Sequence, residues 1–465
     1  MAERFEIRLP GQVAEVIHTL QQAGHEAYAV GGCIRDSILG RKPNDWDITT
    51  SAKPQQVKEL FKRTVDTGIE HGTVTVLMDK TGYEVTTYRI DGEYEDSRHP
   101  KDVTFTASLE EDLKRRDFTM NAMAYNETKG LVDLFDGIGD IRRKTVRCVG
   151  DPKQRFTEDA LRMMRAVRFG AQLGYDIEEK TRDAIRALAG NLSRISAERI
   201  QVELVKLLVS GHPEKIRECH ETGMTAAFFP EFDRMMETGQ NNPHHCYSVG
   251  EHTIRGIMGV RPDKALRLAM LFHDAGKPRT KTTDEKGVDH FYGHAQESAR
   301  IARAVLHRLK FDNDTRIRVE RLVRAHDTDI PCDKRGMRRA LNRLGEDLFP
   351  DLLEVKGADM RAQSLYQRGE KEEKLARLYE LYHEVEAAAE CVSLKDLAVN
   401  GGDLIDMGMK PGKELGVILK ALLEEVIEEP SRNRREYLLK RVADRSLCLP
   451  DPADPAFCDS PSREK

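Results

Sequence analysis

The sequence predicts an α+β protein in which a mixed sheet with helices, over about the first 140 residues, precedes an all-helical remainder. Short apolar runs and alternating stretches rich in β-branched residues occur mainly in that first part. From about residue 155 onward, helical periodicity continues almost without interruption, with Gly and Pro between the helices. The length of 465 residues leaves room for about three domains.

Taken in order, residues 11–24 have apolar positions at helical spacing and end in Gly, which predicts a helix. The apolar run 27–30 predicts a buried strand, and period-two alternation predicts further strands over 73–78, 83–88 and 103–107. We expect a head (1–140), a helical neck (141–240), a His-rich block (244–360), a helical tail (366–445) and a disordered end (450–465). Within the tail, 370–390 predicts one long solvated helix.

Composition excludes several classes of protein. Hydrophobic residues make up 39% of the chain and charged residues 33%, which is typical of packed cores rather than of a disordered chain. No apolar run approaches the ~18–20 residues that span a bilayer, and the first residues do not resemble a secretion signal. The eight cysteines stand singly, without C-x-x-C. We therefore expect a soluble cytoplasmic protein with no membrane partner; the net charge of −5 leaves local basic patches possible.

The most informative stretch combines a double glycine, an arginine and a D-x-D within 17 residues. Gly31 and Gly32, between a strand and a helix, allow the backbone to approach phosphate oxygens, and Arg35 can clamp a triphosphate. Asp45 and Asp47 fall on one side of an expected strand and suit Mg²⁺. Two such ions activate a 3′-hydroxyl and stabilise the leaving pyrophosphate. Taken alone, the double glycine is explained by a plain turn and the D-x-D by a surface loop. The occurrence of glycines, arginine and D-x-D in this order is not explained in that way.

A second cluster contains Arg116, Asp117 and Asn121, which fit a polar site for a ribose and a phosphate. Asp117 also suits a helix cap, and the two interpretations are compatible. Glu84, in an alternating strand, is either a third carboxylate of the site or one half of an edge salt bridge.

A third cluster predicts one helical stripe, with Glu158, Arg162 and Arg165 at i, i+4 and i+7 and Asp159 beside them. These residues form either ordinary ion pairs on a solvated helix or a set that hydrogen-bonds the edge of a base. Residues 141–170 carry nine Lys and Arg, among them Arg168, against three acids. This local excess of +6 suits phosphate contacts.

Together these motifs resemble the class II tRNA nucleotidyltransferase (CCA-adding enzyme) and bacterial poly(A) polymerase family over the first ~210 residues. The resemblance implies that Asp45 and Asp47 are catalytic and bind Mg²⁺, and that Gly31, Gly32 and Arg35 complete their motif. It implies nucleotide binding by a further set: Arg116, Asp117, Asn121, Asp159, Arg162, Arg165 and Arg168. Among these, Asp159 and Arg162 match the protein template that pairs with CTP or ATP, and residues 196–200 match the motif that supports it.

Residues 89–100 match a flexible loop that family members adding only CC lack, although Arg98-His99-Pro100 stands where Arg-Arg-Pro is usual. The loop therefore indicates an enzyme that can incorporate A. In the tail, a basic set is equally compatible with tRNA contact and with a solvated face: Arg432, Arg434, Arg435, Lys440 and Arg441.

The His-rich block contains an ordered His…His-Asp…His…His…Asp series at predicted helix ends: His252, His273, Asp274, His294, His326 and Asp359. Imidazoles and carboxylates in such a set hold one or two transition metals. The series resembles the HD metal-dependent phosphohydrolase superfamily. The resemblance implies a metal such as Ni²⁺, Co²⁺ or Mn²⁺ and hydrolysis of a 2′,3′-cyclic phosphate or a phosphomonoester at a damaged tRNA end. A vestigial HD fold that only packs the body is the alternative.

We therefore expect CCA addition to the 3′ ends of tRNA from CTP and ATP, without a nucleic-acid template. A close alternative is an A-adding enzyme that completes CC-ended tRNA. Poly(A) polymerase is disfavoured because the chain has no long basic C-terminal extension. From other classes, an HD phosphohydrolase is a further alternative, and a (p)ppGpp synthetase/hydrolase is disfavoured by the order of its domains. The sequence makes no prediction of oligomeric state.

Overall fold

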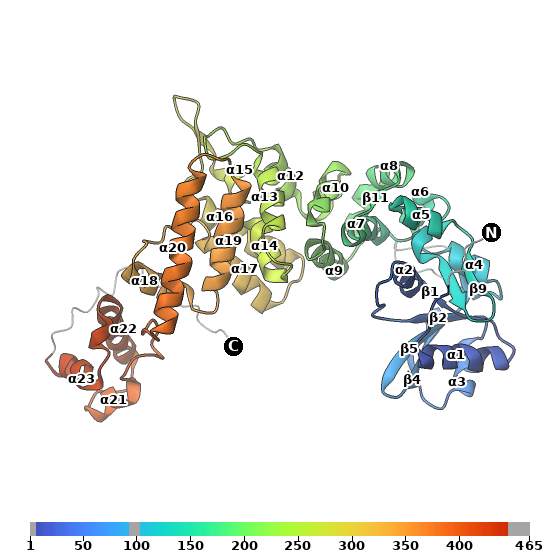
Figure 1. Cartoon of the computed structure of the whole chain (residues 1–465), viewed down its shortest axis with the longest axis horizontal. Helices are drawn as coiled ribbons and strands as arrows, with labels where there is room; N and C mark the ends of the chain where they lie inside the picture. The colour runs from blue at the N-terminus through green and yellow to red at the C-terminus, as the bar shows by residue number, and fades with distance from the viewer. Residues whose placement is uncertain (1–5, 93–102, 445–465) are drawn as a thin grey trace.

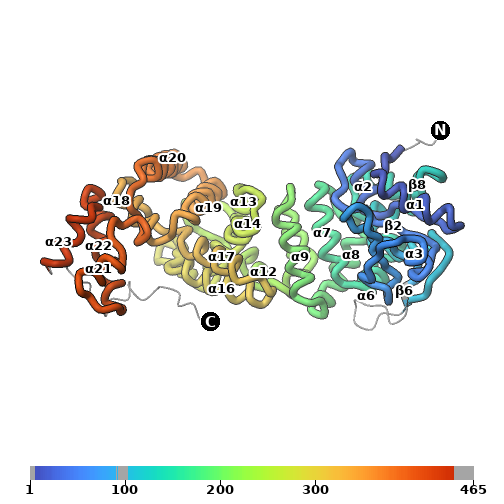
Figure 2. The backbone as a smooth tube through the Cα atoms, turned by 90° about the horizontal axis from the view of Figure 1, so that it is seen from below, coloured from blue at the N-terminus to red at the C-terminus, as the bar shows by residue number. Residues whose placement is uncertain are grey.

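The structure is a computed structural model that describes residues 6–92 and 103–444, arranged as an arc-shaped series of layers (Figure 1). The sheet-containing head lies at one end and the last helices lie at the other, in both the first and the perpendicular view (Figure 2). The expected disordered end, 450–465, and most of the expected loop, 89–100, fall outside the described residues. None of the described helices is both long and apolar enough to cross a membrane.

The head is built on a seven-stranded mixed sheet in the order β3-β4-β5-β2-β1-β8-β9. Its strands are β1 (Ala27–Val30), β2 (Asp47–Thr50), β3 (Thr64–Gly68), β4 (Thr73–Met78), β5 (Thr81–Thr87), β8 (Met123–Asn126) and β9 (Gly130–Asp133). β2 and β5 are parallel, whereas β1 runs antiparallel to both β2 and β8. The strand predicted over 73–78 is confirmed as β4, with Val74 and Val76 buried on its inner face.

Short helices and one small ribbon complete the head: α1 (Gly11–Gln22), α2 (Gly32–Ile38), α3 (Pro54–Leu60), α4 (Leu109–Lys114), β6 (Arg89–Asp91) and β7 (Val103–Phe105). The helix predicted over 11–24 is confirmed as α1, and its apolar stripe of Val13, Val16, Ile17 and Leu20 is buried. A glycine-containing turn leads directly from β1 into α2, which places the helix start beside the end of the strand.

The neck contains α5 (Gly137–Arg143), β10 (Thr145–Val146), α6 (Pro152–Glu158), α7 (Leu161–Leu173), β11 (Asp176–Ile177), α8 (Glu179–Leu188), α9 (Ala197–Leu208), α10 (Ile216–Glu221), α11 (Thr225–Phe228) and α12 (Pro230–Glu237). α7 packs against α9, and α9 reaches α14 of the next layer. One continuous apolar cluster therefore runs from the head through the neck into the His-rich block.

The His-rich block contains α13 (Val249–Met258), α14 (Lys264–Phe272), α15 (Lys277–Thr280), β12 (Thr282–Thr283), β13 (Asp289–His290), α16 (His294–Arg308), α17 (Asn313–Ala325), α18 (Lys334–Leu344) and α19 (Phe349–Ala362). The tail contains α20 (Arg368–Ala387), α21 (Gly401–Asp406), α22 (Lys413–Glu428) and α23 (Arg435–Ala443). The long helix predicted over 370–390 is confirmed as α20, which packs against α18 and α19. A separate apolar cluster, including Leu422 and Leu438, forms the core around α22 and α23.

The α+β fold class is confirmed, but the part after the head is largely rather than wholly helical, because β10 pairs with β11 and β12 pairs with β13. Two further local predictions are also wrong. Asp47 is the first residue of β2, so Asp45 precedes the strand rather than alternating within it. The ladder ends at the pair Val30–Asp47 because the chain turns away at Gly31, where φ is +88°. The predicted stripe from Glu158 to Arg165 is divided between α6 and α7, because Asp159 adopts an extended conformation.

Candidate nucleotidyl-transfer site and metal cluster

The turn after β1 brings the backbone close to an arginine. Gly31 has a φ of +88°, which only glycine adopts without strain. A Cβ atom at Gly31 would lie 3.2 Å from Nη1 of Arg116, and one at Gly32 would lie 3.6 Å from Nη2 of Arg35. The double glycine therefore leaves room for two guanidinium groups beside the start of α2.

Three carboxylates gather at this edge of the sheet. Asp47 begins β2, Glu84 lies on the neighbouring β5, and Asp45 is close enough to act on both electrostatically. Partial burial and the charge of Asp45 raise the pKa of Asp47, although Arg116 opposes the shift. Partial burial and the charges of Asp47 and Asp45 raise the pKa of Glu84. None of the three forms an ion pair among the described residues, so their combined negative charge fits a divalent cation.

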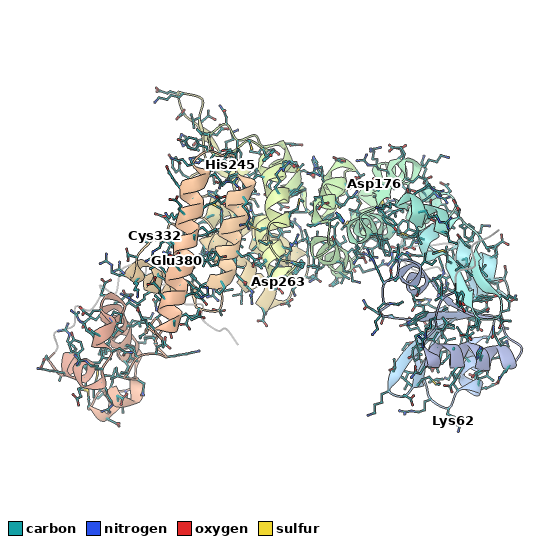
Figure 3. All side chains as sticks on the ribbon, viewed as in Figure 1. Lys62, Asp176, His245, Asp263, Cys332 and Glu380 are labelled. Carbon is teal, nitrogen blue, oxygen red and sulfur yellow. The ribbon has the colours of Figure 1, made fainter. Side chains whose placement is uncertain are left out.

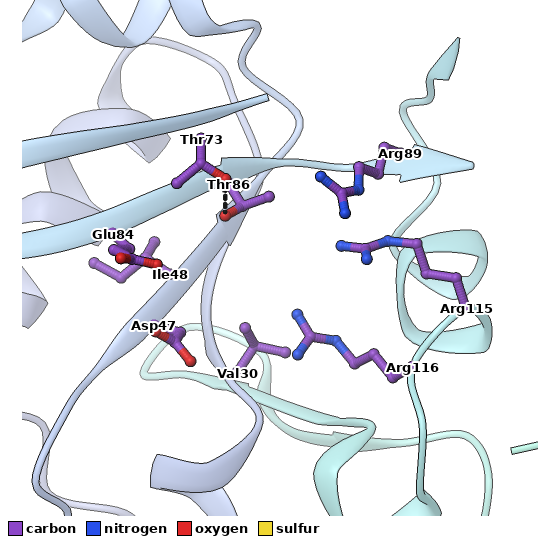
Figure 4. A pocket seen from close by; sticks show the side chains of 9 residues that line it. All are labelled: Val30, Asp47, Ile48, Thr73, Glu84, Thr86, Arg89, Arg115 and Arg116. Atoms are coloured by element: carbon purple, nitrogen blue, oxygen red, sulfur yellow. Dashed lines mark hydrogen bonds between the residues drawn. The ribbon is translucent and has the colours of Figure 1, made fainter. Parts of the chain in front are cut away.

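Three arginines face these carboxylates across a pocket of about 200 Å³. Figure 4 shows Asp47 and Glu84 on one side of the pocket and the guanidinium groups of Arg89, Arg115 and Arg116 on the other. Arg116 was expected at this site from its sequence motif, whereas Arg89 and Arg115 were not. Arg115 adjoins Arg116 in the chain and Arg89 follows an alternating strand, so position in the sequence alone did not separate them from surface arginines.

A chain of polar contacts joins the head to the neck. Arg35 Nη1 donates to Oδ1 of Asn121 at 2.6 Å, and Asn121 Nδ2 donates to Oδ1 of Asp117 at 3.2 Å. Arg165, on α7, donates through Nε and Nη2 to Oδ2 of Asp117 at 2.8 and 2.6 Å. Burial of Asp117 favours the neutral acid, but the Arg165 guanidinium lowers the pKa of that carboxyl to about 2. The structure thus brings these four predicted residues together.

The predicted template residues lie at the junction of α6 and α7. Arg162 donates to Oε2 of Glu158 at 2.7 Å, and Arg199 donates to Oδ2 of Asp159 at 2.8 Å. Oδ1 of Asp159 also accepts from the backbone N–H of Leu161 at 3.0 Å, which holds the start of α7. Arg199 belongs to the expected supporting segment 196–200, and its contact fixes the orientation of the Asp159 carboxylate.

Arg168 has a different environment. Its guanidinium donates to Glu203 at 2.5 Å and to Gln172 at 2.7 Å, and it lies over the ring of Phe169 at 3.8 Å from the centroid. Arg168 is only 7% exposed and does not line the pocket between the head carboxylates and arginines. Its contacts show packing of α7 against α9, and a role in nucleotide binding stays a prediction.

A second polar cluster lies within the His-rich block, where His245 marks one end of the helical layer and Asp263 the other (Figure 3). The cluster contains two groups of three residues, and within each group the ligand atoms all lie within 4.8 Å of one another. Asp274 belongs to both groups. His252 and His273 form the first group with Asp274, and His294 and His326 form the second. Asp359 Oδ1 accompanies the first group, 2.8 Å from Nε2 of His252. All six predicted residues are therefore close together.

The four imidazoles present their Nε2 nitrogens to one another. Each Nδ1 faces a backbone carbonyl oxygen at 2.7–3.2 Å, on Ala362, Met270, Phe291 and Val323 respectively. Because a carbonyl oxygen only accepts, each Nδ1 carries a proton, and Nε2 is the nitrogen left to bind a metal in the neutral imidazole. The Nε2 atoms of His252 and His273 lie 3.2 Å apart, and those of His294 and His326 lie 3.3 Å apart. Imidazole nitrogens that converge in this way beside a buried carboxylate fit the ligand arrangement of a metal centre.

The chain matches three family models: "Poly A polymerase head domain" over residues 27–147, "Probable RNA and SrmB- binding site of polymerase A" over 174–236, and "tRNA nucleotidyltransferase domain 2 putative" over 282–442. These matches cover most of the head, much of the neck, and the helical layers from residue 282 onward, but not α13 and α14.

Two curated relatives and one solved structure similar to this chain are CCA-adding enzymes. The CCA-adding enzyme of Lactiplantibacillus plantarum is 37% identical over 92% of this chain and 95% of its own length. That of Levilactobacillus brevis is 54% identical over 46% of this chain and 53% of its own. The crystal structure of the Bacillus stearothermophilus CCA-adding enzyme in complex with CTP is 32% identical over 95% of this chain and 99% of its own, with a TM-score of 0.70. These matches confirm the resemblance seen in the head motifs, and the chain belongs to the CCA-adding enzyme family of tRNA nucleotidyltransferases.

Proposed function

We propose that this chain completes the 3′ end of tRNA by adding C, C and A from CTP and ATP without a nucleic-acid template. The observation that carries the proposal is the pocket in which unpaired Asp47 and Glu84 face three arginines. Carboxylates for a divalent cation and guanidinium groups for a triphosphate are the two requirements of nucleotidyl transfer. The similar Bacillus stearothermophilus enzyme is known in complex with CTP, which agrees with this assignment.

Asp45 and Asp47, with Glu84 beside them, would hold Mg²⁺, because their charges are not neutralised by ion pairs among the described residues. When bound, the ion stabilises negative charge on the attacking oxygen and on the leaving pyrophosphate. The 3′-oxygen of the tRNA forms a bond to the α-phosphorus of the nucleotide while the bond from that phosphorus to the bridging oxygen breaks. The proton of the 3′-hydroxyl is released to water, and the pyrophosphate leaves with the bridging oxygen, so atoms and charge balance.

Arg116 lies beside the glycine turn and is placed to bind the phosphates, and Arg35 supports the same turn through its bond to Asn121. The base is selected at the junction of α6 and α7, where Asp159 offers an acceptor and Arg162 offers donors. In the structure these two side chains bond to Arg199 and Glu158, so a base must share or replace those contacts.

The experiment offers labelled CTP and ATP to tRNA that ends at the discriminator base and, in parallel, to CC-ended tRNA. On the first substrate we expect label from both nucleotides with the wild type and none with Asp45→Ala. Incorporation of ATP alone, and only into CC-ended tRNA, would replace the proposal with the A-adding alternative. Long A tracts would indicate a poly(A) polymerase. The absence of any incorporation by the wild type would refute nucleotidyl transfer altogether.

A second candidate function is supported by the six-residue cluster of the His-rich block. Oδ2 of Asp274 lies 3.3 Å from Nε2 of His273, and Oδ1 lies 3.5 Å from Nε2 of His294. The two carboxylate oxygens thus face different imidazole pairs, so Asp274 would serve as a ligand with either pair, and the six residues would hold one or two transition metals. When bound, such metals supply a nucleophilic hydroxide for phosphate ester hydrolysis.

This second proposal predicts hydrolysis of 2′,3′-cyclic AMP in the presence of Ni²⁺, Co²⁺ or Mn²⁺. The activity should disappear in His273→Ala and survive in Asp45→Ala, because the two sites lie in different layers of the fold. If the wild type binds metal but hydrolyses neither this ester nor a phosphomonoester, the vestigial interpretation holds instead.

A further inference from the structure

Behind the arginines of the nucleotide pocket lies a buried carboxylate that belongs to none of the recognised motifs. Asp112 is on α4 and is fully buried. Its Oδ1 accepts hydrogen bonds from Nε and Nη2 of Arg115 at 3.0 and 2.8 Å. Its Oδ2 accepts from the hydroxyl of Thr49 at 3.0 Å and from Nη2 of Arg116 at 3.5 Å. One carboxylate therefore contacts both arginines at once.

The same carboxylate connects the two sides of the pocket. Thr49 is fully buried and belongs to β2, two residues after Asp47. Its bond to Asp112 ties the strand that presents the acidic residues to the helix that precedes Arg115. Although burial disfavours the ionised form, the charges of Arg115 and Arg116 lower the pKa of Asp112, so it is charged at neutral pH.

Arg116 has a donor to spare for a ligand. Its Nη2 is held by Asp112 and its Nη1 faces the backbone at Gly31. Its Nε is buried and has no hydrogen-bond partner among the described residues. A buried donor without a partner is costly unless a ligand or water satisfies it. A phosphate oxygen at the glycine turn would do so, and Figure 4 shows the Arg115 and Arg116 side chains extending in parallel toward that space.

We infer that Asp112 is a positioning residue for the incoming nucleotide: it holds Arg115 and Arg116 so that both face the triphosphate, and it does not itself touch the nucleotide. The inference rests on the proposed nucleotidyl transfer. The two hydrogen bonds from Arg115 to Asp112 fix the plane of the Arg115 guanidinium. Recognition of a phosphate by arginine requires a guanidinium with a fixed orientation. Because CTP and ATP share the triphosphate, Asp112 affects both nucleotides equally.

The test measures binding of CTP and of CMP to the full chain by calorimetry, with Mg²⁺ and without tRNA, so that no turnover occurs. Asp112→Asn keeps the shape of the side chain and removes its charge. We expect CTP to bind about tenfold more weakly to this variant, with the affinity for CMP unchanged. A carboxylate that only stabilised the head would not distinguish a triphosphate from a monophosphate. In Arg115→Gln, adding Asp112→Asn should weaken CTP binding much less than it does in the wild type.

Asp140 is the matched control, because its buried carboxylate also accepts from two arginines and a threonine: Arg143, Arg147 and Thr119. Asp140→Asn should lower stability without changing the affinity for CTP. If the wild type itself does not bind CTP, the proposed function fails. If the wild type binds CTP but Asp112→Asn binds it equally well, or loses CTP and CMP alike, the positioning role is refuted. Should Asp112→Asn not fold, Arg115→Gln must show the same selective loss of CTP, and an equal loss of both ligands overturns the inference.

Discussion

Arg165 of α7 donates two hydrogen bonds to one carboxylate oxygen of Asp117, at 2.8 and 2.6 Å, and this contact joins the neck to the head. Asp117 in turn accepts from Asn121, which accepts from Arg35 beside the glycine turn. The helix that carries the expected base-selecting arginine is thereby held in register with the pocket that we propose for the triphosphate. The proposed site has one part in the head and one in the neck, so it depends on a contact such as Asp117–Arg165 to keep the two parts in place.

The Asp117–Arg165 pair makes a prediction about stability and pH. The pKa of Asp117 is lowered from its ordinary value of 3.8 to about 2, so its ionised form favours the folded state by about 2 kcal/mol. This contribution is complete above the unfolded pKa and is lost as the pH falls from about 4 toward 2. Asp117→Asn should therefore lower the free energy of unfolding of the head at pH 6, and the difference from the wild type should shrink below pH 4.

Urea unfolding followed by fluorescence is a suitable measurement, because Trp46 is the single tryptophan and lies in the head. A difference between Asp117→Asn and the wild type that is the same at pH 6 and at pH 3 would show that the ion pair is not the source of the stability.

The carboxylates of the pocket should be essential for catalysis and not for folding. Asp45→Asn or Asp47→Asn should reduce CTP incorporation on the order of 10³-fold or more, because the site loses a ligand for its cation. Asp79→Asn, in the exposed turn between β4 and β5, removes the same charge and should leave the rate unchanged. The measurement is the rate of CTP incorporation by each variant with saturating tRNA. Equal rates in all three variants would remove the metal-binding assignment.

Base choice should depend on the junction of α6 and α7. Arg162→Ala should lower the preference for CTP over UTP by about tenfold, because each good base-edge contact is worth about 1–3 kcal/mol. Arg186, an exposed arginine of α8 that pairs with Asp183, is the matched control. Competition between labelled CTP and UTP on one tRNA measures the preference. An unchanged preference in Arg162→Ala, with a lower rate for both nucleotides, would limit Arg162 to a structural role.

Metal content distinguishes two ions from a single one in the His-rich block. With Mn²⁺, and with the head carboxylates removed by Asp45→Ala and Asp47→Ala in every sample, the otherwise wild-type chain should bind about two ions, His294→Ala about one and Asp274→Asn none, because Asp274 belongs to both ligand groups. His383 on α20 is exposed, and His383→Ala should not change the count. Calorimetry and elemental analysis give the stoichiometry. A value of one ion in the otherwise wild-type chain and in His294→Ala alike would show that only the His252–His273 group binds.

Much of this site could be predicted because local chemistry determined it. Gly31 and Gly32 stand between an apolar run and a helical pattern, which predicts a turn between a strand and a helix. The period-two alternation of 73–78 predicts β4 with the same first and last residues that the structure has. The six metal-ligand candidates come from several helices, yet their order and their positions near helix ends indicated a common site. Each of these predictions rests on neighbouring residues or on a fixed order of residue types along the chain, and both can be seen in a single sequence.

The remainder depends on contacts between distant residues. Arg199 bonds to Asp159 from 40 positions away. The family resemblance implied that residues 196–200 support the template residues, but no spacing rule identifies Arg199 as the partner of Asp159. Asp112 is the last of three consecutive acids in the first turn of α4, and nothing in that local pattern indicates that it is fully buried behind the pocket. The break between α6 and α7 was missed because Glu158 and Arg162 form their i,i+4 ion pair across it, so the spacing that predicts a continuous helix is satisfied without one.

The order of nucleotide addition tests the central claim most directly. Purified protein is incubated with tRNA ending at the discriminator base, with CTP alone, ATP alone or both, and the 3′ ends are sequenced. We predict that CTP alone gives ends in CC, that ATP alone gives no extension, and that both together give CCA and stop there. Ends that remain unextended with CTP, while CC-ended tRNA gains a single A, would contradict the claim of full CCA addition.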